Sequence, residues 1–479
     1  MINRSKLLLP VLTSVVVVLV AFHESVAQAP ESREQVLQRV QTLEQQMETF
    51  QAELTKLKTL LAENQNTTTE PKHAVAPPET GKVAPRKQEA ATKQLSGFEL
   101  GPIRAIPYGT IYFNAFGNSG GTNNADVPLF ATPTNQGNVG MSVRQTRLGL
   151  KLEGPTVAHA KVRAQVEADF FGGFPAVGIG DNFGLVRLRL ATVRLDWEKT
   201  ALEVGQDWMV FAPNNPVSIA AAAIPQEAAA GNPWARLPQI RLERRWASGK
   251  VLLQAAALAP STGDSPTATS SSFFLQPGSG GVSRVPFLQS RLSINSANWF
   301  GTGKTGAIGI STHYGRSKVG NSEGDSVGLA SDWTIPLVPR LQIAGEAFVG
   351  RNLGGFQAGV FQSLNTDFAY RNGSVLRSGG IRSIGTRGGW IQLGFTPPVF
   401  ENALTLYGTF GIDDPRNSDL ISLNKHDWRL RNQAIALSFL YKITPQFSWG
   451  MEFRRFNTDY LQSGKQTANH LNLGGAFSF

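Results

Sequence analysis

The chain has 479 residues, of which 41% are hydrophobic and 17% are charged, and it contains no cysteine. The charged fraction lies below the roughly 25% that is usual for soluble domains. The absence of cysteine excludes disulfide bonds and a lipid anchor on an N-terminal cysteine. The net charge of +10 favours an anionic partner.

Residues 1–27 have the pattern of a secretory signal peptide. Arg4 and Lys6 supply the basic start, residues 7–22 are apolar, and residues 25–27 form a small-residue cleavage site. An uncleaved N-terminal anchor is the alternative, although the apolar stretch is short for a spanning helix. Because an exported protein rarely meets nucleic acid, we expect small anions or acidic lipid as partners and no nucleic acid.

Residues 28–63 carry an unbroken heptad pattern, the a/d seam of a coiled coil. An amphipathic helix packed on its own domain is the alternative, but Gln, Glu and Lys fill the other positions. We predict a helix that oligomerises, and the phenylalanine in the seam favours a trimer. The predicted coiled-coil core is Val36, Val40, Leu43, Met47, Phe50, Leu54, Leu57 and Leu61.

Residues 64–97 read as a flexible linker rich in Pro, Thr and Lys, with almost no large apolar residue.

From Tyr108 onward, apolar and polar residues alternate with a period of two. Short connections alternate strictly with long ones rich in Gly, Asn, Ser and Pro, which is typical of an outer-membrane barrel with both ends in the periplasm. The sequence predicts an all-β transmembrane fold over residues 98–479: a 16-stranded antiparallel outer-membrane β-barrel, with fourteen or eighteen strands as alternatives. The expected strands are 108–116, 142–153, 160–171, 185–197, 200–208, 237–246, 249–259, 286–297, 305–315, 326–335, 340–350, 381–396, 402–412, 427–442, 446–457 and 468–479.

The two faces of the expected strands have different chemistry. Apolar residues alternate with charged ones, and a charge facing lipid at mid-membrane costs about 2–4 kcal/mol, so the charged set is assigned to a watery interior. A soluble barrel would have the opposite orientation. Tryptophans at expected strand ends suit a membrane-interface girdle: Trp197, Trp208, Trp246, Trp299 and Trp428.

Arginine dominates the face assigned to the lumen. Guanidinium groups bind carboxylates and phosphates in a planar fork, and rings of them select anions in pores. Arg147, Arg163 and Arg189 are expected to stack near mid-height. The acidic residues either pair with the arginines and stiffen the wall or set up a transverse field that orients a solute. The basic set is Arg144, Arg147, Arg163, Arg187, Arg189, Arg241, Arg291, Arg429, Arg431 and Arg454, with Lys161; the acidic set is Glu167, Asp169, Glu203, Asp207 and Glu243.

Residues 209–236 form an alanine-rich, mostly uncharged connection. An exposed loop would carry more polar groups, so we predict that this segment folds inward and narrows the pore; a subunit contact is the alternative.

Motifs for catalysis lack their structural context. Residues 117–121 match G-x-S-x-G in a Gly/Asn-rich loop without a strand-to-helix elbow, and residues 301–305 resemble a phosphate loop without its first glycine. The six histidines are scattered. We therefore predict no enzyme, no cofactor and no metal site.

Four stretches within residues 144–211 carry a family resemblance: "RQTRLGLKLEG", "KVRAQVEADFFGG", "VRLRLATVRLDW" and "LEVGQDWMVF". They resemble the second to fifth strands of the DcaP-like trimeric outer-membrane porins, with an Arg-containing strand, E-x-D-F-F, R-x-R and G-Q-x-W. The resemblance in architecture covers nearly the whole chain. It implies a homotrimer in the bacterial outer membrane, a periplasmic coiled coil, and passive uptake of small, mainly anionic solutes such as dicarboxylates.

Two other functions remain open. Phosphate-selective porins have a similar plan and an arginine-lined pore. A cell-envelope tether would use the coiled coil and linker to contact the cell wall, with the barrel as an anchor.

The last ten residues, "HLNLGGAFSF", alternate as a strand up to Phe479. A membrane barrel cannot leave an edge open, so this strand is expected to pair with the first. The resemblance implies that Phe479 is also the signal read by the barrel-assembly machinery.

Overall fold

The computed structural model describes residues 97–479 except residue 135 and segments 175–183 and 263–275. The predicted signal peptide (1–27), coiled coil (28–63) and all but the last residue of the predicted linker (64–97) lie outside the described residues. Within the described segments, no helix is long and apolar enough to cross a membrane.

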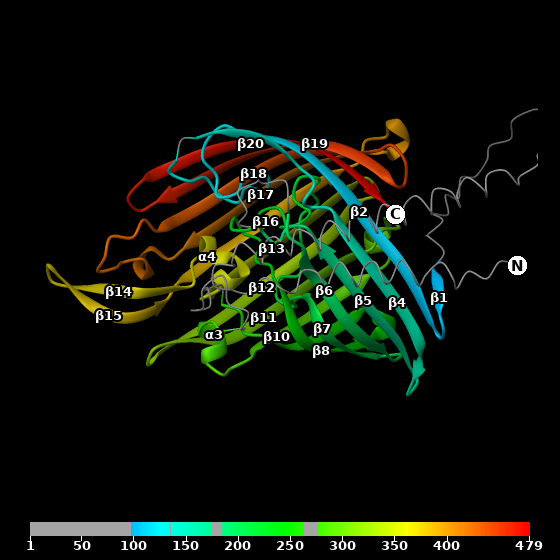
Figure 1. Cartoon of the computed structure of the whole chain (residues 1–479), viewed down its shortest axis with the longest axis horizontal. Helices are drawn as coiled ribbons and strands as arrows, with labels where there is room; N and C mark the ends of the chain where they lie inside the picture. The colour runs from blue at the N-terminus through cyan, green and yellow to red at the C-terminus, as the bar shows by residue number, and fades with distance from the viewer. Residues whose placement is uncertain (1–96, 135, 175–183, 263–275) are drawn as a thin grey trace, which may run out of the picture. The chain divides into compact units, whose positions relative to one another are not determined.

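Sixteen antiparallel strands form a closed barrel (Figure 1). Successive barrel strands pair along the chain, and β2 closes the ring by pairing with both β4 and β20. This confirms the predicted strand number, and each predicted strand overlaps an observed one. The barrel strands are β2 (Ile103–Asn118), β4 (Arg147–Val157), β5 (Ala160–Asp169), β6 (Arg187–Asp196), β7 (Thr200–Trp208), β8 (Arg236–Trp246), β9 (Val251–Leu258), β10 (Phe287–Ser296), β11 (Gly306–Val319), β12 (Ser322–Val338), β13 (Leu341–Arg351), β16 (Gly385–Phe395), β17 (Leu404–Pro415), β18 (Arg429–Lys442), β19 (Phe447–Tyr460) and β20 (Gly464–Ser478).

The remaining strands and helical turns are not part of the sixteen-stranded barrel. β1 (Phe98–Leu100) folds back on the start of β2, and β3 (Asn138–Ser142) pairs with its end. β14 (Leu364–Asn372) and β15 (Val375–Ser383) form a separate hairpin. Its two-residue turn is Gly373-Ser374, next to the Asn372-Gly373 dipeptide that is a strong hairpin signal. Most of this segment was expected to be a connection between the strands at 340–350 and 381–396. The helical turns are α3 (Ser279–Val282), α4 (Ala358–Phe361), η2 (Ala247–Gly249), η3 (Trp299–Gly301), η4 (Gly354–Phe356), η5 (Phe400–Asn402) and η6 (Asn417–Asp419).

The strands present apolar side chains outward and polar ones inward. On β10, Leu292 and Ile294 point outward and are 52% and 59% exposed. Arg291, which precedes Leu292 in the chain, points inward and is 8% exposed. A soluble barrel would bury the apolar set instead. The arrangement therefore matches a barrel whose outer face meets lipid.

The chain end closes the barrel. The backbone N–H of Phe479 donates to the Gly109 carbonyl (3.1 Å), and the N–H of Gly109 donates to the Phe479 carbonyl (3.2 Å). A Cβ at Gly109 would lie 2.6 Å from the Phe479 ring, so only glycine lets the terminal aromatic lie over β2.

Candidate functional site

The connection from β7 to β8, residues 209–235 (the L3 loop), runs around the inner wall of the barrel. The backbone N–H of Val210 donates to Gln289 Oε1 on β10 (2.9 Å). The N–H of Ala212 donates to Ser311 Oγ on β11 (3.1 Å). Because the loop has few polar side chains, its buried backbone groups need partners on the wall. The predicted inward folding is confirmed.

The loop reaches the opposite wall as well. The N–H of Val217 donates to Gln392 Oε1 on β16 (2.9 Å), and the Ser218 hydroxyl donates to Glu452 on β19 (2.7 Å). Gln145, which is 1% exposed, accepts from the N–H groups of residues 222 and 223 at 2.8 and 2.9 Å. The L3 loop therefore spans the lumen and is held at several strands.

We predict that Gln145→Ala releases the part of the L3 loop around residues 222 and 223 from the barrel wall. The substitution leaves the part-buried N–H of Ala222 and the buried N–H of Ala223 without an acceptor, and a buried unsatisfied donor costs about 1–3 kcal/mol. Single-channel recordings should show a larger and noisier conductance than the parent. Gln446→Ala, at an exposed position in the turn between β18 and β19, serves as the control and should behave as the parent does.

Two other connections also fold inward, and this was not predicted from the sequence. Leu129 and Phe130, before β3, pack with Trp234 and Val360, and Phe356 packs with Phe211. A short apolar run in each connection, around residues 127–131 and 353–361, is the sequence feature that could have predicted the inward folding. These contacts give the barrel an apolar core inside its lumen, beside the L3 loop.

A group of charged residues, here called the basic cluster, faces the lumen next to the L3 loop. Arg189 donates to Glu167 Oε1 (2.7 Å) and to Asp169 Oδ2 (2.8 Å), and Arg187 donates to Asp169 Oδ2 (2.6 Å). Arg187 and Arg236 both donate to the carbonyl of L3 residue 223, at 3.0 and 2.9 Å. The basic cluster comprises Arg147, Arg187, Arg189, Arg236, Glu167 and Asp169.

A β-bulge builds this cluster. Glu167 pairs with Leu190, whereas Ala168 pairs with Leu188, so Arg189 is an extra residue in β6. The bulge lets Arg187 and Arg189 share the carboxylate of Asp169. It also reverses the alternation beyond it, which turns Arg194 inward. An unbroken period of two would place Arg194 on the outer face, so it was not among the predicted lumen residues.

Two arginines of the basic cluster have no ion-pair partner within the described part of the chain. Arg147 donates to the Tyr112 hydroxyl (3.1 Å). Arg236 lies over the rings of Trp208 and Trp234, at 4.7 and 5.1 Å, and its buried Nη1 makes no hydrogen bond to a described residue. Four arginines against two carboxylates leave an excess of two positive charges beside the L3 loop.

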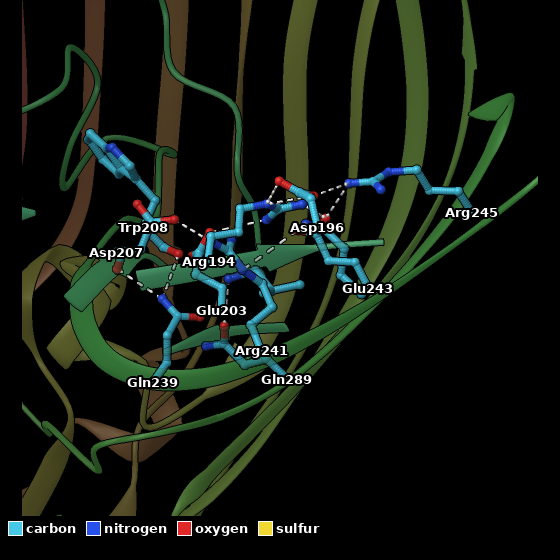
Figure 2. A network of polar contacts seen from close by, with 12 residues as sticks. Arg194, Asp196, Glu203, Asp207, Trp208, Gln239, Arg241, Glu243, Arg245 and Gln289 are labelled. Atoms are coloured by element: carbon cyan, nitrogen blue, oxygen red, sulfur yellow. Dashed lines mark hydrogen bonds and ion pairs between the residues drawn. The ribbon is translucent and has the colours of Figure 1, made fainter. Parts of the chain in front are cut away.

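A second group, the neutral cluster, lies on β5 to β8 (Figure 2). Arg241 donates to both Glu203 and Asp207, and Arg194 donates to Glu203 (3.1 Å) and Glu243 (2.6 Å). Four arginines meet four carboxylates, so the cluster carries no net charge. Its members are Arg163, Arg194, Arg241, Arg245, Asp196, Glu203, Asp207 and Glu243.

The predicted acidic lumen residues are all in ion pairs. Glu167 and Asp169 contact arginines of the basic cluster, and Glu203, Asp207 and Glu243 contact those of the neutral cluster. This geometry favours the interpretation that they stiffen the wall. The free positive charge lies with Arg147 and Arg236.

A cavity of 210 Å³ lies under the L3 loop and is lined by Asn214, Gln392 and Tyr407. Lys304 and Arg340, from the turns before β11 and β13, also line it. Neither cation forms an ion pair with a described residue. The cavity therefore adds unpaired positive charge on the side of the short turns.

Comparison with solved structures places this geometry in a known fold. The crystal structure of the outer membrane channel DcaP of Acinetobacter baumannii matches with a TM-score of 0.58 at 18% identity, covering 80% of this chain and 100% of that one. The chain has the porin fold. An anion-selective porin from Comamonas acidovorans matches with a TM-score of 0.48 at 12% identity, over 79% of this chain and 100% of that one. No protein-family model and no curated protein matches the sequence.

The other predicted arginines take different places in this porin fold. Arg144 donates to Asp126 (2.7 Å) in the connection before β3, and Arg291 donates to Asp332 (2.6 Å). Arg454, which is 1% exposed, donates to Glu452 (2.5 Å). Arg429 donates to the carbonyl of residue 360 (2.8 Å). These contacts hold loops and walls together.

Three expectations are corrected. Arg431 lies on the outer face, because a register shift between Arg429 and Arg431 turns it toward Asp414, away from the interior where Asn432 is buried. Arg163 pairs in register with Arg194 of the neutral cluster, so it does not stack with Arg147 and Arg189. Trp208 packs on Trp234 inside the barrel rather than in a girdle.

Glu227, in the L3 loop, is a buried carboxyl without a hydrogen-bond partner among the described residues. Burial raises its pKa to about 8; Arg454 opposes this shift and Glu452 adds to it. The pKa of Glu227 is therefore higher in the folded state than in the unfolded state. Its effect on the free energy of unfolding is most favourable below about pH 4.5, where the carboxyl is neutral in both states, and that stability is lost as the pH rises through about 8.

We predict that the urea midpoint of the parent falls between pH 5 and pH 9 more steeply than that of Glu227→Gln. The amide cannot ionise, so this variant lacks the penalty of charging a buried group. Unfolding curves at matched ionic strength measure the difference. Equal slopes in parent and variant would contradict the assignment.

Proposed function

We propose that this protein is an outer-membrane channel for passive diffusion of small, mainly anionic solutes. The observation that carries the proposal is the excess of two positive charges in the basic cluster beside the L3 loop. Guanidinium groups favour carboxylates and phosphates, and the charges of Arg147 and Arg236 are not neutralised by an ion pair within the described residues. The outward apolar face and the porin fold support a place in the outer membrane.

The solute class follows from the same donors. A dicarboxylate carries two negative charges that match the two unpaired positive charges, and inorganic phosphate is the alternative. Replacing chloride on one side of a planar bilayer by succinate or by phosphate, and measuring the zero-current potential, compares the two. A succinate permeability below that of phosphate would favour the phosphate-selective alternative.

We propose a homotrimer in which residues 28–63 form a periplasmic coiled coil, and Phe479 as the signal for barrel assembly. The heptad pattern supports the first proposal and the terminal aromatic strand supports the second. Cross-linking of the detergent-purified full chain should give trimers. A chain without residues 28–96 should still conduct if the channel is the functional part, whereas a tether would lose its cell-wall contact.

A further inference from the structure

A groove, here called the rim groove, lies on the outer wall of the barrel. It has a volume of 430 Å³ and lies where β13, β16, β17 and β18 meet the longer connections. Arg387, Arg416 and Arg431 line it, together with one acid, Asp414. Three guanidinium groups against one carboxylate leave an excess of two positive charges.

The strand register shows that the groove faces away from the lumen. Arg387 pairs with Val349, which is 54% exposed, and with Asp414 on the other side. The neighbours Asp413 and Asn432 face the interior and are fully buried. The rim groove therefore opens on the outer face.

The arginines of the rim groove keep most of their donors free. Asp414 accepts from Arg387 and from Arg431 at 3.2 Å each, which places the two guanidinium groups on either side of it. Their side chains remain 77% and 47% exposed. Arg416 has no ion-pair partner in the described ranges. A guanidinium has five donors, so the three arginines can surround a further anion.

The same strands carry an apolar surface next to the groove. Ile391 and Ile435 lie four residues further along β16 and β18 and are 41% and 44% exposed, and Phe410 between them is 40% exposed. An arginine deep in lipid is costly, whereas at headgroup level it meets phosphate and water. A ligand that fits both surfaces has a phosphate and acyl chains.

We propose that the rim groove binds the phosphate of a phosphorylated lipid in the outer leaflet, with the acyl chains lying on the apolar surface below. Arg387, Arg416 and Arg431 donate to the phosphate oxygens. Asp414 orients Arg387 and Arg431 and reduces the net positive charge of the rim groove.

Native mass spectrometry of the detergent-purified full chain tests this proposal with diphosphoryl lipid A and its dephosphorylated form, which share acyl chains. The parent should bind the diphosphoryl form at least about tenfold more tightly. The triple variant Arg387→Gln, Arg416→Gln, Arg431→Gln should lose this preference. The matched control, Arg244→Gln, Arg371→Gln, Arg377→Gln, removes three positive charges elsewhere and should keep it.

Three outcomes would overturn the proposal: an unchanged preference in the triple variant, an equal loss in the control, or full displacement of the lipid by equimolar inorganic phosphate. If the triple variant does not fold, Arg387→Gln alone, at an exposed position, should weaken the preference by several-fold. Conductance in planar bilayers should match the parent in every folded variant, which separates this site from the channel.

Discussion

Replacing Arg147 and Arg236 by glutamine is expected to lower the ratio of anion to cation permeability by about threefold or more. These two arginines supply the unpaired charge of the basic cluster, so the substitutions leave its remaining arginines and carboxylates balanced. The shift in zero-current potential under a KCl gradient measures the effect.

Arg431→Gln together with Arg455→Gln provides the matched control for this prediction. Both residues lie on the outer face, on β18 and β19, so the double variant removes the same charge without changing the lumen. An equal loss of selectivity in the control would mean that overall charge, and not the basic cluster, sets the preference.

Replacing Arg291 by methionine is expected to destabilise the barrel by about 3–5 kcal/mol, because Asp332 is left charged and unpaired inside. Arg291 and Asp332 are 8% and 1% exposed and form two hydrogen bonds, at 3.0 and 2.6 Å. Urea unfolding of the barrel in lipid vesicles measures the free energy of unfolding.

Removing both charges should restore most of the loss. The double variant Arg291→Met, Asp332→Leu replaces a buried ion pair by apolar side chains of similar size, which is often neutral. Arg316→Met, at an exposed ion pair with Glu323, should unfold as the parent does. A double variant as unstable as Arg291→Met alone would show that the loss is due to packing rather than to an unpaired charge.

The strand plan could be predicted because one period of two runs through the chain and short turns alternate with long connections. That pattern is local, and it sets strand number, faces and closure. Register irregularities are not local. The extra residue at Arg189 and the shift at Arg431 depend on the partner strands, and each changes which side chains reach the lumen.

The composition of the candidate site was also predictable in part. Alanines in residues 209–236 indicated that the L3 loop folds inward, since an exposed loop needs polar groups. Which arginines are paired and which are free depends on contacts that only the structure shows. Arg241 contacts two carboxylates, whereas Arg236 lies on two tryptophan rings. No sequence spacing distinguishes them.

The sign of ion selectivity tests the central claim most directly. The purified full chain, reconstituted in a planar bilayer under a tenfold KCl gradient, should give a zero-current potential biased toward chloride, because Arg147 and Arg236 leave unpaired positive charge beside the L3 loop. A potential biased toward potassium would contradict the account.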